Sequence, residues 1–160
     1  MALTDDGDLI RGLGFVALYA AYLEEAVDEC LEVVLAQDAE RDEGLYRRPT
    51  SQKIEYIHKQ LRELEPLSEE LERFLQVLPE ICELLEKRNF VIHGRVYAVP
   101  NVGDVRLSGR RGVPEQPANS AELYALANDL FSARNPLLHA LKFSLNRQFV
   151  ANRERNGGNA

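Results

Sequence analysis

The sequence EKRNFVIHG, residues 86–94, ends a helical pattern that begins near Ser68. Apolar residues recur through this pattern at steps of three and four, which predicts an amphipathic helix of a helical bundle; they are Leu71, Phe74, Leu75, Leu78, Ile81, Cys82, Leu85 and Ile92. Arg88 and Asn89 fall where the apolar stripe calls for Leu or Val. Because an unpaired polar side chain is costly to bury, these two residues either have a dedicated partner or lie on a face that lines a solvated cleft or an interface.

The spacing of the polar residues in this stretch limits what one helix can do. Arg88 and His93 are five positions apart, which leaves them roughly 140° apart at about 100° per residue. Asn89 and His93 share a face, because they are one helical turn apart. We therefore expect either a distorted helix or a second copy of the chain that supplies one of the two groups. Gly94 suits the left-handed position that follows a helix end, and a cation such as His93 is favoured in the last turn.

An Arg-Asn-x-x-x-His sequence at a helix end resembles the R-x4-6-H motif of the HEPN superfamily, and the resemblance covers roughly residues 8 to 150. The helix with Tyr-Leu-Glu-Glu-Ala and the helix with Gln-Lys-Ile-Glu-Tyr-Ile fit the layout of such domains. The resemblance implies an all-helical domain that is often dimeric. Active members cleave RNA without a metal, with two motifs meeting across the dimer, so Arg88, Asn89 and His93 would be the catalytic residues.

A second Arg-Asn-x-x-x-His sequence runs from Arg134 to His139 with the same spacing. It contains Pro136 and lies in the middle of a predicted helix. The first copy follows a long helix, has helical residues between its Arg and His, and precedes Gly94. The context therefore favours the first copy as the functional motif.

Length and composition predict one globular domain. The chain has 160 residues, of which 45% are hydrophobic and 28% charged, and this is enough for a single core. We expect a domain at 1–150 and a disordered tail at 151–160.

No long apolar run and no signal-peptide pattern is present, so we expect a cytoplasmic protein without a membrane contact. Cys30 and Cys82 lie in apolar helical stripes, which predicts buried free thiols rather than a disulfide.

The net charge of −7 is unevenly distributed along the chain. Residues 1–86 carry 8 Lys and Arg against 21 Asp and Glu, whereas residues 87–160 carry 11 against 5. Phosphate contacts need a local excess of Lys and Arg rather than a basic protein. The change of sign at the motif is therefore compatible with a nucleic-acid site, and equally with an acidic solvated face beside a basic tail.

The remaining pattern predicts an all-α, antiparallel bundle of four to five helices with a short β-hairpin or loop excursion near 95–112. We expect a short flexible lead at 1–7, a first helix over 9–36, a loop at 37–49 and a second helix capped by Thr50 or Ser51. A third helix should begin at Ser68, with a kink or break near Val77-Leu78 caused by Pro79. Pro114 to Pro117 reads as a linker. The last helix begins after Asn119, with Glu122 in capping-box position, and Pro136 should kink it.

The residues around the motif suggest a chemistry. His93 could act as the base or the acid of a cleavage by the RNA's own 2′-hydroxyl. Arg88 could hold the phosphorane oxygens, and Asn89 could orient His93 or bind phosphate. Candidate substrate-binding residues are Lys87, Arg95, Arg106, Arg110 and Arg111. We expect no metal and no cofactor, because no metal-ligand spacing and no Gly-rich phosphate loop is present.

One position departs from the family. Some members extend the motif to R-x4-H-x-Y, where the Tyr is modified by a partner antitoxin; here Arg95 stands at that position and the nearest tyrosine is Tyr97. Three interpretations follow. In the first, the chain is an HEPN-type endoribonuclease, a toxin or defence effector with RNA, a second copy and a neutralising protein as expected partners. It is a non-catalytic HEPN-like binding or transcription-regulatory module, like the mannitol operon repressor-like proteins. Or it is a structural helical module in which Arg88 and Asn89 pair with Asp28 or Glu32.

Overall fold

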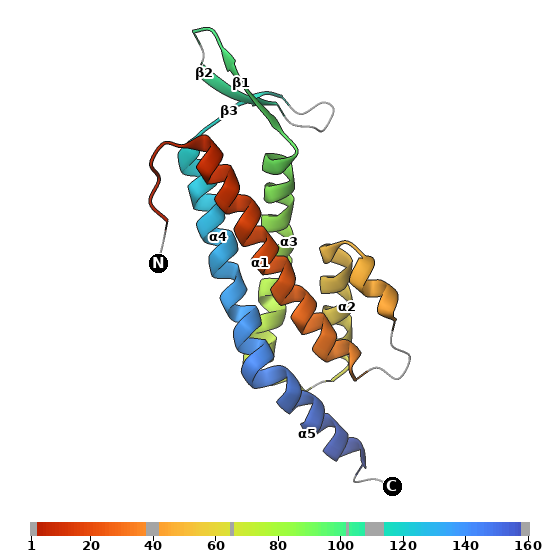
Figure 1. Cartoon of the computed structure of the whole chain (residues 1–160). Helices are drawn as coiled ribbons and strands as arrows, with labels where there is room; N and C mark the ends of the chain where they lie inside the picture. The colour runs from red at the N-terminus through yellow and green to blue at the C-terminus, as the bar shows by residue number, and fades with distance from the viewer. Residues whose placement is uncertain (1–2, 38–41, 65, 102, 108–113, 158–160) are drawn as a thin grey trace. The chain divides into compact units, whose positions relative to one another are not determined.

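The computed structural model describes residues 3–37, 42–64, 66–101, 103–107 and 114–157. It confirms the all-α class with a small sheet (Figure 1). The elements in chain order are α1 (Leu9–Leu35), the 3₁₀ helix η1 (Glu43–Arg47), α2 (Thr50–Arg62), α3 (Glu69–Ile92), the strands β1 (Arg95–Val99), β2 (Gly103–Leu107) and β3 (Gln116–Pro117), α4 (Ser120–His139), the π-helical segment η2 (Ala140–Leu145) and α5 (Asn146–Gly157).

Two of the predicted helix starts carry a polar cap. The Asp8 carboxylate accepts a hydrogen bond of 2.9 Å from the backbone N–H of Arg11 at the start of α1. The Asn119 side chain accepts one of 2.9 Å from the backbone N–H of Ala121 and so caps α4 as predicted. The start of α2 differs, because Pro49 occupies the cap position without a side-chain bond. Thr50 instead donates its hydroxyl to Glu24 of α1 at 3.3 Å.

The two prolines expected to bend helices behave differently. Pro79 lies inside α3, which runs without a break from Glu69 to Ile92. The apolar residues Leu75, Leu78 and Ile81 around it are all buried, so packing holds the helix together across the missing backbone donor. Pro136 lies near the end of α4, and the backbone widens into η2 four residues later. A π-turn is one way in which a helix accommodates a disrupted hydrogen-bond ladder.

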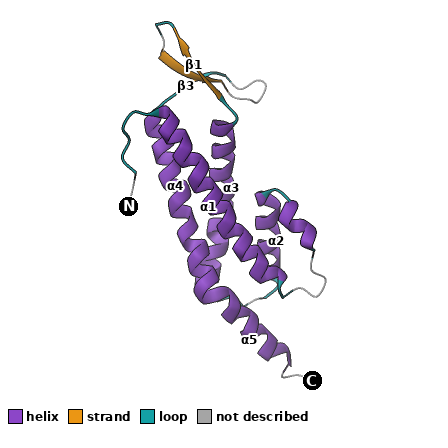
Figure 2. Ribbon diagram, viewed as in Figure 1, coloured by secondary structure: helices purple, strands orange, loops and turns teal. Residues whose placement is uncertain are grey.

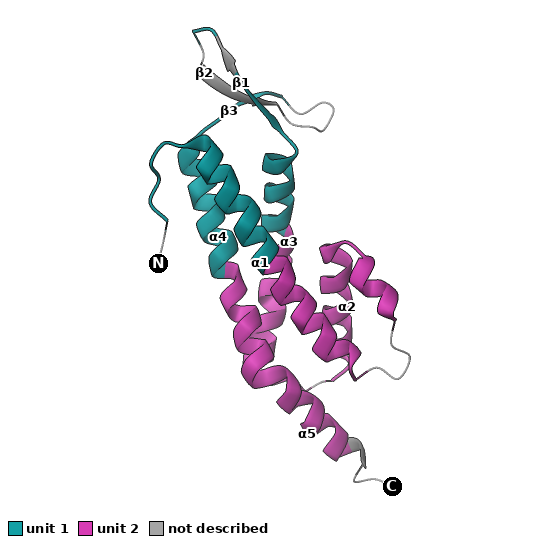
Figure 3. Ribbon diagram, viewed as in Figure 1, with its two compact units in different colours: residues 1–22, 83–132 teal, residues 23–82, 133–160 magenta. Residues whose placement is uncertain are grey.

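The chain divides into two compact units, residues 1–22 with 83–132 and residues 23–82 with 133–160 (Figure 3). Their boundaries fall inside α1, α3 and α4. The buried apolar residues of the first unit include Val16, Ala20, Leu85, Val91, Leu123, Tyr124, Leu126, Ala127 and Leu130. The largest fully buried residues of the second unit are Leu23, Leu31, Leu35, Ile57, Leu61, Leu71, Leu75, Leu78, Ile81, Leu137 and Leu145. The single domain expected at 1–150 stays a prediction.

The excursion after α3 is a small antiparallel sheet in the order β1-β2-β3 (Figure 2). Arg95 lies opposite Leu107 and Val99 opposite Gly103, which confirms the predicted hairpin. Asn101 has a φ of 63° in the connecting turn, a conformation that Asn tolerates. The predicted linker at Pro114 to Pro117 is wrong in part, because β3 pairs with β2 there. An extended pair of residues can bond to the second edge of β2, and such a short strand has no periodicity of its own.

The structure continues α5 to Gly157, and so describes a helix over most of the stretch 151–160 that was expected to be a disordered tail. Residues 151–156 contain no Pro or Gly that would end a helix. Phe149 is buried and anchors the preceding turn of α5. The tail residues 158–160 lie outside the described residues.

The two cysteines are free thiols, as predicted, but only Cys30 is buried, whereas Cys82 is half-buried. The Cys30 Sγ donates to the Leu137 carbonyl at 3.8 Å. Burial, with a smaller contribution from Glu29, raises the pKa of the Cys30 thiol to about 12. Cys30 is therefore a packing residue of the second unit rather than a nucleophile.

The described N-terminal residues of the first unit bond to α4 rather than forming the flexible lead expected at 1–7. The backbone N–H of Leu3 donates to the Asn128 side chain at 2.8 Å. The Tyr124 hydroxyl donates to the Asp6 carboxylate at 2.7 Å. Burial and this hydrogen bond raise the pKa of Tyr124 to about 12, and the same bond is the largest cause that lowers the pKa of Asp6.

A matched pair of glycine substitutions tests how closely α1 approaches α4 in the first unit. A Cβ on Gly12 would lie 3.0 Å from the Leu123 Cβ and 3.2 Å from the Tyr124 ring, whereas a Cβ on Gly14 would meet nothing within 4 Å. Gly14→Ala should raise the free energy of unfolding by about 0.5–1 kcal/mol, because Ala favours the helix. Gly12→Ala should not raise the free energy of unfolding, because the added methyl group would crowd Leu123 and Tyr124. Urea unfolding of both variants checks this, and equal stabilisation by the two would contradict the close approach.

The bond between Tyr124 and Asp6 predicts a pH-dependent stability difference. A lowered carboxyl pKa stabilises the fold above the ordinary value of 3.8 and loses this contribution as the pH falls through the folded-state pKa. A raised tyrosine pKa stabilises the fold below the ordinary value of 10.0, and this is lost as the pH rises through about 12. Tyr124→Phe should therefore lower Tm at pH 7, with a gap to the wild type that narrows below pH 3.8 and above pH 10.

Thermal melting across this pH range measures that gap. Tyr19→Phe is the control, because the Tyr19 ring packs on Phe15 and Phe131 and the substitution keeps those ring contacts. A gap between Tyr124→Phe and the wild type that stays constant with pH would show that the hydroxyl acts through packing alone.

Candidate functional site

The first Arg-Asn-x-x-x-His copy lies at the C-terminal end of α3, as the sequence predicted. The backbone N–H of His93 donates to the Asn89 carbonyl at 3.1 Å, and that of Gly94 donates to the Val91 carbonyl at 3.3 Å. His93 is therefore still tied to the last turn and shares a face with Asn89. Gly94 does not adopt the expected left-handed conformation, since among the described residues only Gly7 and Asn101 have a positive φ. The chain passes directly from Gly94 into β1.

The motif side chains differ in exposure. His93 and Lys87 are exposed, whereas Arg88 and Asn89 are half-buried. The Nε atom of Arg88 is fully buried, and Arg88 is not without a partner in the folded chain. The contrast between Arg88 and His93 agrees with the roughly 140° that separates them on a helix. One chain thus offers His93 to solvent together with a neighbouring Asn89, but not together with an equally open Arg88.

The candidate substrate-binding arginines are only partly described. Arg95 is exposed at the first position of β1, two residues after His93. Arg106 lies in β2, where its backbone pairs with Val96 of β1 and Gln116 of β3. Arg110 and Arg111 lie outside the described residues, so their role in substrate binding stays a prediction.

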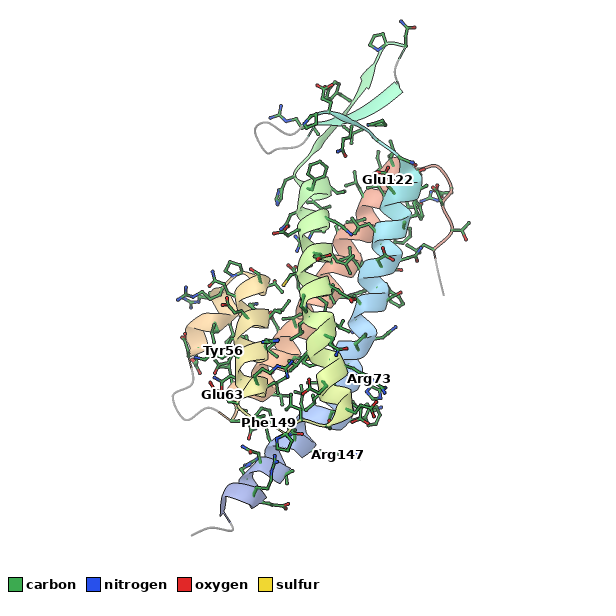
Figure 4. The ribbon with its side chains drawn as sticks, turned by 180° about the vertical axis from the view of Figure 1, so that it is seen from behind. Tyr56, Glu63, Arg73, Glu122, Arg147 and Phe149 are labelled. Atoms are coloured by element: carbon green, nitrogen blue, oxygen red, sulfur yellow. The ribbon has the colours of Figure 1, made fainter. Side chains whose placement is uncertain are left out.

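A hollow of about 360 Å³ lies beside the motif, within the first unit, and sequence reasoning missed it. Phe90, Val91 and Leu126 supply part of its apolar wall, and Lys87, Glu122 and Asp129 are its charged residues. Figure 4 shows Glu122 at the start of α4. The lining does not include Arg88, Asn89 or His93. Because two carboxylates accompany the single Lys87, this hollow is a poor phosphate site, and Lys87 contributes to it as well as to the motif surface.

Tyr97, the tyrosine nearest to the family's modified position, forms a hydrogen bond with a nearby residue. Its hydroxyl donates to the Glu115 carboxylate just before β3. This bond raises the pKa of Tyr97. Tyr97 is still exposed, but its hydroxyl is engaged within the sheet region.

The second Arg-Asn-x-x-x-His copy lies in the second unit and has a similar pattern of exposure. Arg134 is half-buried with a buried Nε atom, and His139 is exposed. Asn135 is exposed, unlike the half-buried Asn89. His139 ends α4 and is followed by η2 rather than by a strand. The two copies therefore share a spacing but not a backbone context.

The structural alternative named Asp28 as a partner of the motif. In the second unit, the Asp28 carboxylate accepts a hydrogen bond of 2.5 Å from the Lys53 ammonium. The Lys53 side chain is 9% exposed and that of Asp28 is 42% exposed, so the pair lies at the edge of the core. Asp28 thus has a cationic partner on α2.

A comparison of the chain with protein-family models, curated proteins and solved structures finds no match. In the part of the chain that the structure describes, no three His, Cys, Asp or Glu side chains gather as metal ligands. None of the described helices is both long and apolar enough to cross a membrane. The functional argument therefore rests on the residues and geometry of the motif.

Exposure of the motif residues predicts their cost to stability. His93→Ala should change the free energy of unfolding by less than about 0.5 kcal/mol, because His93 is exposed. Arg88→Ala should cost more, because it removes a half-buried side chain whose Nε is fully buried. Urea unfolding of the two variants measures this. A His93→Ala variant that unfolds as readily as Arg88→Ala would make His93 a structural residue.

Proposed function

We propose that this chain is a metal-independent endoribonuclease of the HEPN type, which acts in the cytoplasm as a homodimer with a site shared between two copies. The observation that carries the proposal is the exposed His93 at the end of α3, one turn from Asn89 and two residues from the exposed Arg95. A neutralising protein partner belongs to the same proposal.

The chemistry needs two proton transfers and one charge neutralisation. A base removes the proton of the RNA 2′-hydroxyl, whose oxygen attacks the adjacent phosphorus. An acid gives a proton to the leaving 5′-oxygen, which yields a cyclic phosphate and a free 5′-hydroxyl. A histidine side chain can serve as the base or as the acid of such a reaction, and His93 would take either role. Arg88 would stabilise the additional negative charge on the phosphorane, and Asn89 would hold His93 or a phosphate oxygen in place.

A shared site follows from the geometry of one chain. Base and acid act on opposite sides of the phosphorus, and one motif supplies one histidine. Arg88 and His93 of one chain differ in exposure. Two copies that meet at their motifs would supply both histidines and would let the Arg88 of one copy act near the His93 of the other. Such a site needs no distortion of α3.

The charge distribution supports the choice of RNA as substrate. The motif opens the positive half of the chain, where residues 87–160 carry 11 Lys and Arg against 5 Asp and Glu. Lys87 and Arg95 flank His93 and are exposed. Positive side chains around the scissile phosphate would draw in the RNA backbone despite the overall negative charge of the protein.

The test is RNA cleavage in EDTA by the purified wild type, His93→Ala and Arg88→Ala, with a melting curve for each. The wild type should cleave, and each variant should lose about 100-fold or more in rate. His58→Gln is the control, because His58 belongs to α2 of the second unit and is not part of the motif, and it should keep wild-type activity. Wild type that is folded and leaves RNA intact would contradict cleavage and favour the binding or regulatory module.

A mixing experiment tests the shared site. Arg88→Ala and His93→Ala should each be strongly impaired alone, because each homodimer lacks both copies of one group. A co-refolded mixed dimer would contain one intact Arg88 and one intact His93, so its cleavage should exceed that of either variant and stay below that of the wild type, which has both histidines. Cleavage by a wild-type monomer, measured by sedimentation at the assay concentration, would contradict the dimer.

A further inference from the structure

The junction between α4 and α5 combines several features that the motif at α3 does not explain. His139 is exposed at the end of α4. The π-helical segment η2 begins at the next residue. Single π-turns inside helices occur frequently at functional sites. All residues discussed below belong to the second unit.

Two hollows meet at His139. The first, of about 260 Å³, is lined by His139, Phe143 and Arg147 on one side and by Glu70 at the start of α3 on the other. The second, of about 250 Å³, is lined by His139, Glu70 and Arg73 among others. Figure 4 shows Arg73 on α3 and Arg147 on α5 on the same side of this unit. Each volume lies just below the usual range of ligand pockets, about 300–1,000 Å³, and fits a ligand about the size of one nucleotide.

An exposed aromatic ring faces the first hollow. Phe143 is 44% exposed, and its ring centroid lies 5.0 Å from that of His139 at a tilt of 48°. The Lys142 ammonium lies 5.2 Å from the Phe143 centroid. An apolar ring that the fold leaves open, held by a second ring and beside a cation, is a suitable surface for stacking a planar base.

The charges around the hollow favour an anion near Arg147. Arg147 forms no ion pair with any carboxylate that the structure describes. Glu70 is the one acidic residue of the first lining, and it is held by the helix start. Its own backbone N–H and the Ser68 hydroxyl are the main causes that lower its pKa, with smaller contributions from Arg73 and His139.

The wall of the first hollow is fixed by a buried side chain. Gln148 is 7% exposed. Its amide nitrogen donates to the carbonyls of Leu64 at 3.3 Å and Pro66 at 3.0 Å, and its carbonyl oxygen accepts from the backbone N–H of Ser68 at 3.3 Å. These bonds tie the turn before α3 to α5. The hollow is thus formed before a ligand arrives, which lowers the entropic cost of binding.

We propose that this hollow binds one phosphorylated nucleotide unit, with the base on Phe143 and the phosphate beside Arg147 and His139. A free nucleoside monophosphate and one nucleotide of single-stranded RNA share this chemistry. The proposal does not depend on cleavage at the α3 motif, because binding needs only residues of the second unit. Arg147, Phe143 and His139 come from one continuous stretch, 139–147, whose spacing is set by η2.

The test measures anisotropy of a fluorescein-labelled uridine heptanucleotide whose 2′-hydroxyls are methylated, with full-length His93→Ala as the background. The 2′-O-methyl groups and the missing His93 prevent cleavage, so a failure here is independent of the proposed reaction. Phe143→Ala and Arg147→Gln should each raise the Kd at least about fivefold. Arg153→Gln, an exposed arginine of α5 outside the hollow, should change it less than twofold. Melting curves confirm that each variant is folded.

The outcomes separate the sources of the ligand. Competition by uridine monophosphate at millimolar concentration would assign the hollow to a free nucleotide, and competition by the unlabelled heptanucleotide alone would assign it to an RNA strand. Absence of binding would overturn the proposal, as would equal weakening by Arg153→Gln. Binding to phosphatidylglycerol vesicles but not to either nucleotide probe would assign the surface to lipid headgroups and would also overturn it.

Discussion

The continuous burial of one face of α1 is the constraint on which the rest of the structure depends. Val16, Leu23 and Val27 on this face are fully buried, and they fall on both sides of the boundary between the units. In the first unit, α1 approaches α4 so closely that a Cβ added at Gly12 would lie 3.0 Å from the Leu123 Cβ. In the second, Cys30 contacts the Leu137 carbonyl of α4 at 3.8 Å. Each unit therefore builds its core against its own part of α1, and a polar substitution on this face would destabilise the unit in which it lies, because the polar group would be buried there.

The elements predicted from the sequence were those with a strong period or a local cap. The stripe from Leu71 to Ile92 predicted α3, because all of its residues except the half-buried Cys82 and Ile92 are buried. Asn119 marked the start of α4 through a bond that its own side chain makes. The strand β3 was missed because two residues carry no alternation and pair only where β2 offers an edge. Likewise, the leader was expected to be flexible because no sequence pattern reports that Leu3 and Asp6 bond to α4.

The same limit applies to the candidate sites. The sequence placed Asn89 and His93 one turn apart, and the backbone bond between them is consistent with that placement. The hollow beside Lys87 could not be predicted from the sequence, because its walls come from α3 and α4, which are separated in the sequence by the three strands. The π-turn after His139 was also missed. A proline predicts a disturbed helix, but whether the disturbance becomes a kink or a wider turn depends on the packing of Ala140 and Leu145, which are both buried.

The two Arg-Asn-x-x-x-His copies separate what spacing determines from what context determines. In both, helical geometry turns the arginine inward and leaves the histidine exposed. The first copy ends its helix, and His93 is followed by β1 with the exposed residues Arg95, Val96 and Tyr97, so that it could face a second copy of the chain. The second copy continues into η2, which brings Phe143 and Arg147 beside His139 and places the group against the start of α3. His139 lines two hollows and lies beside the Phe143 ring. This arrangement is better suited to holding a ligand than to cleaving a bond in a site shared with another subunit. Spacing alone therefore cannot assign a function to either copy, and the residues that follow each histidine carry the distinction.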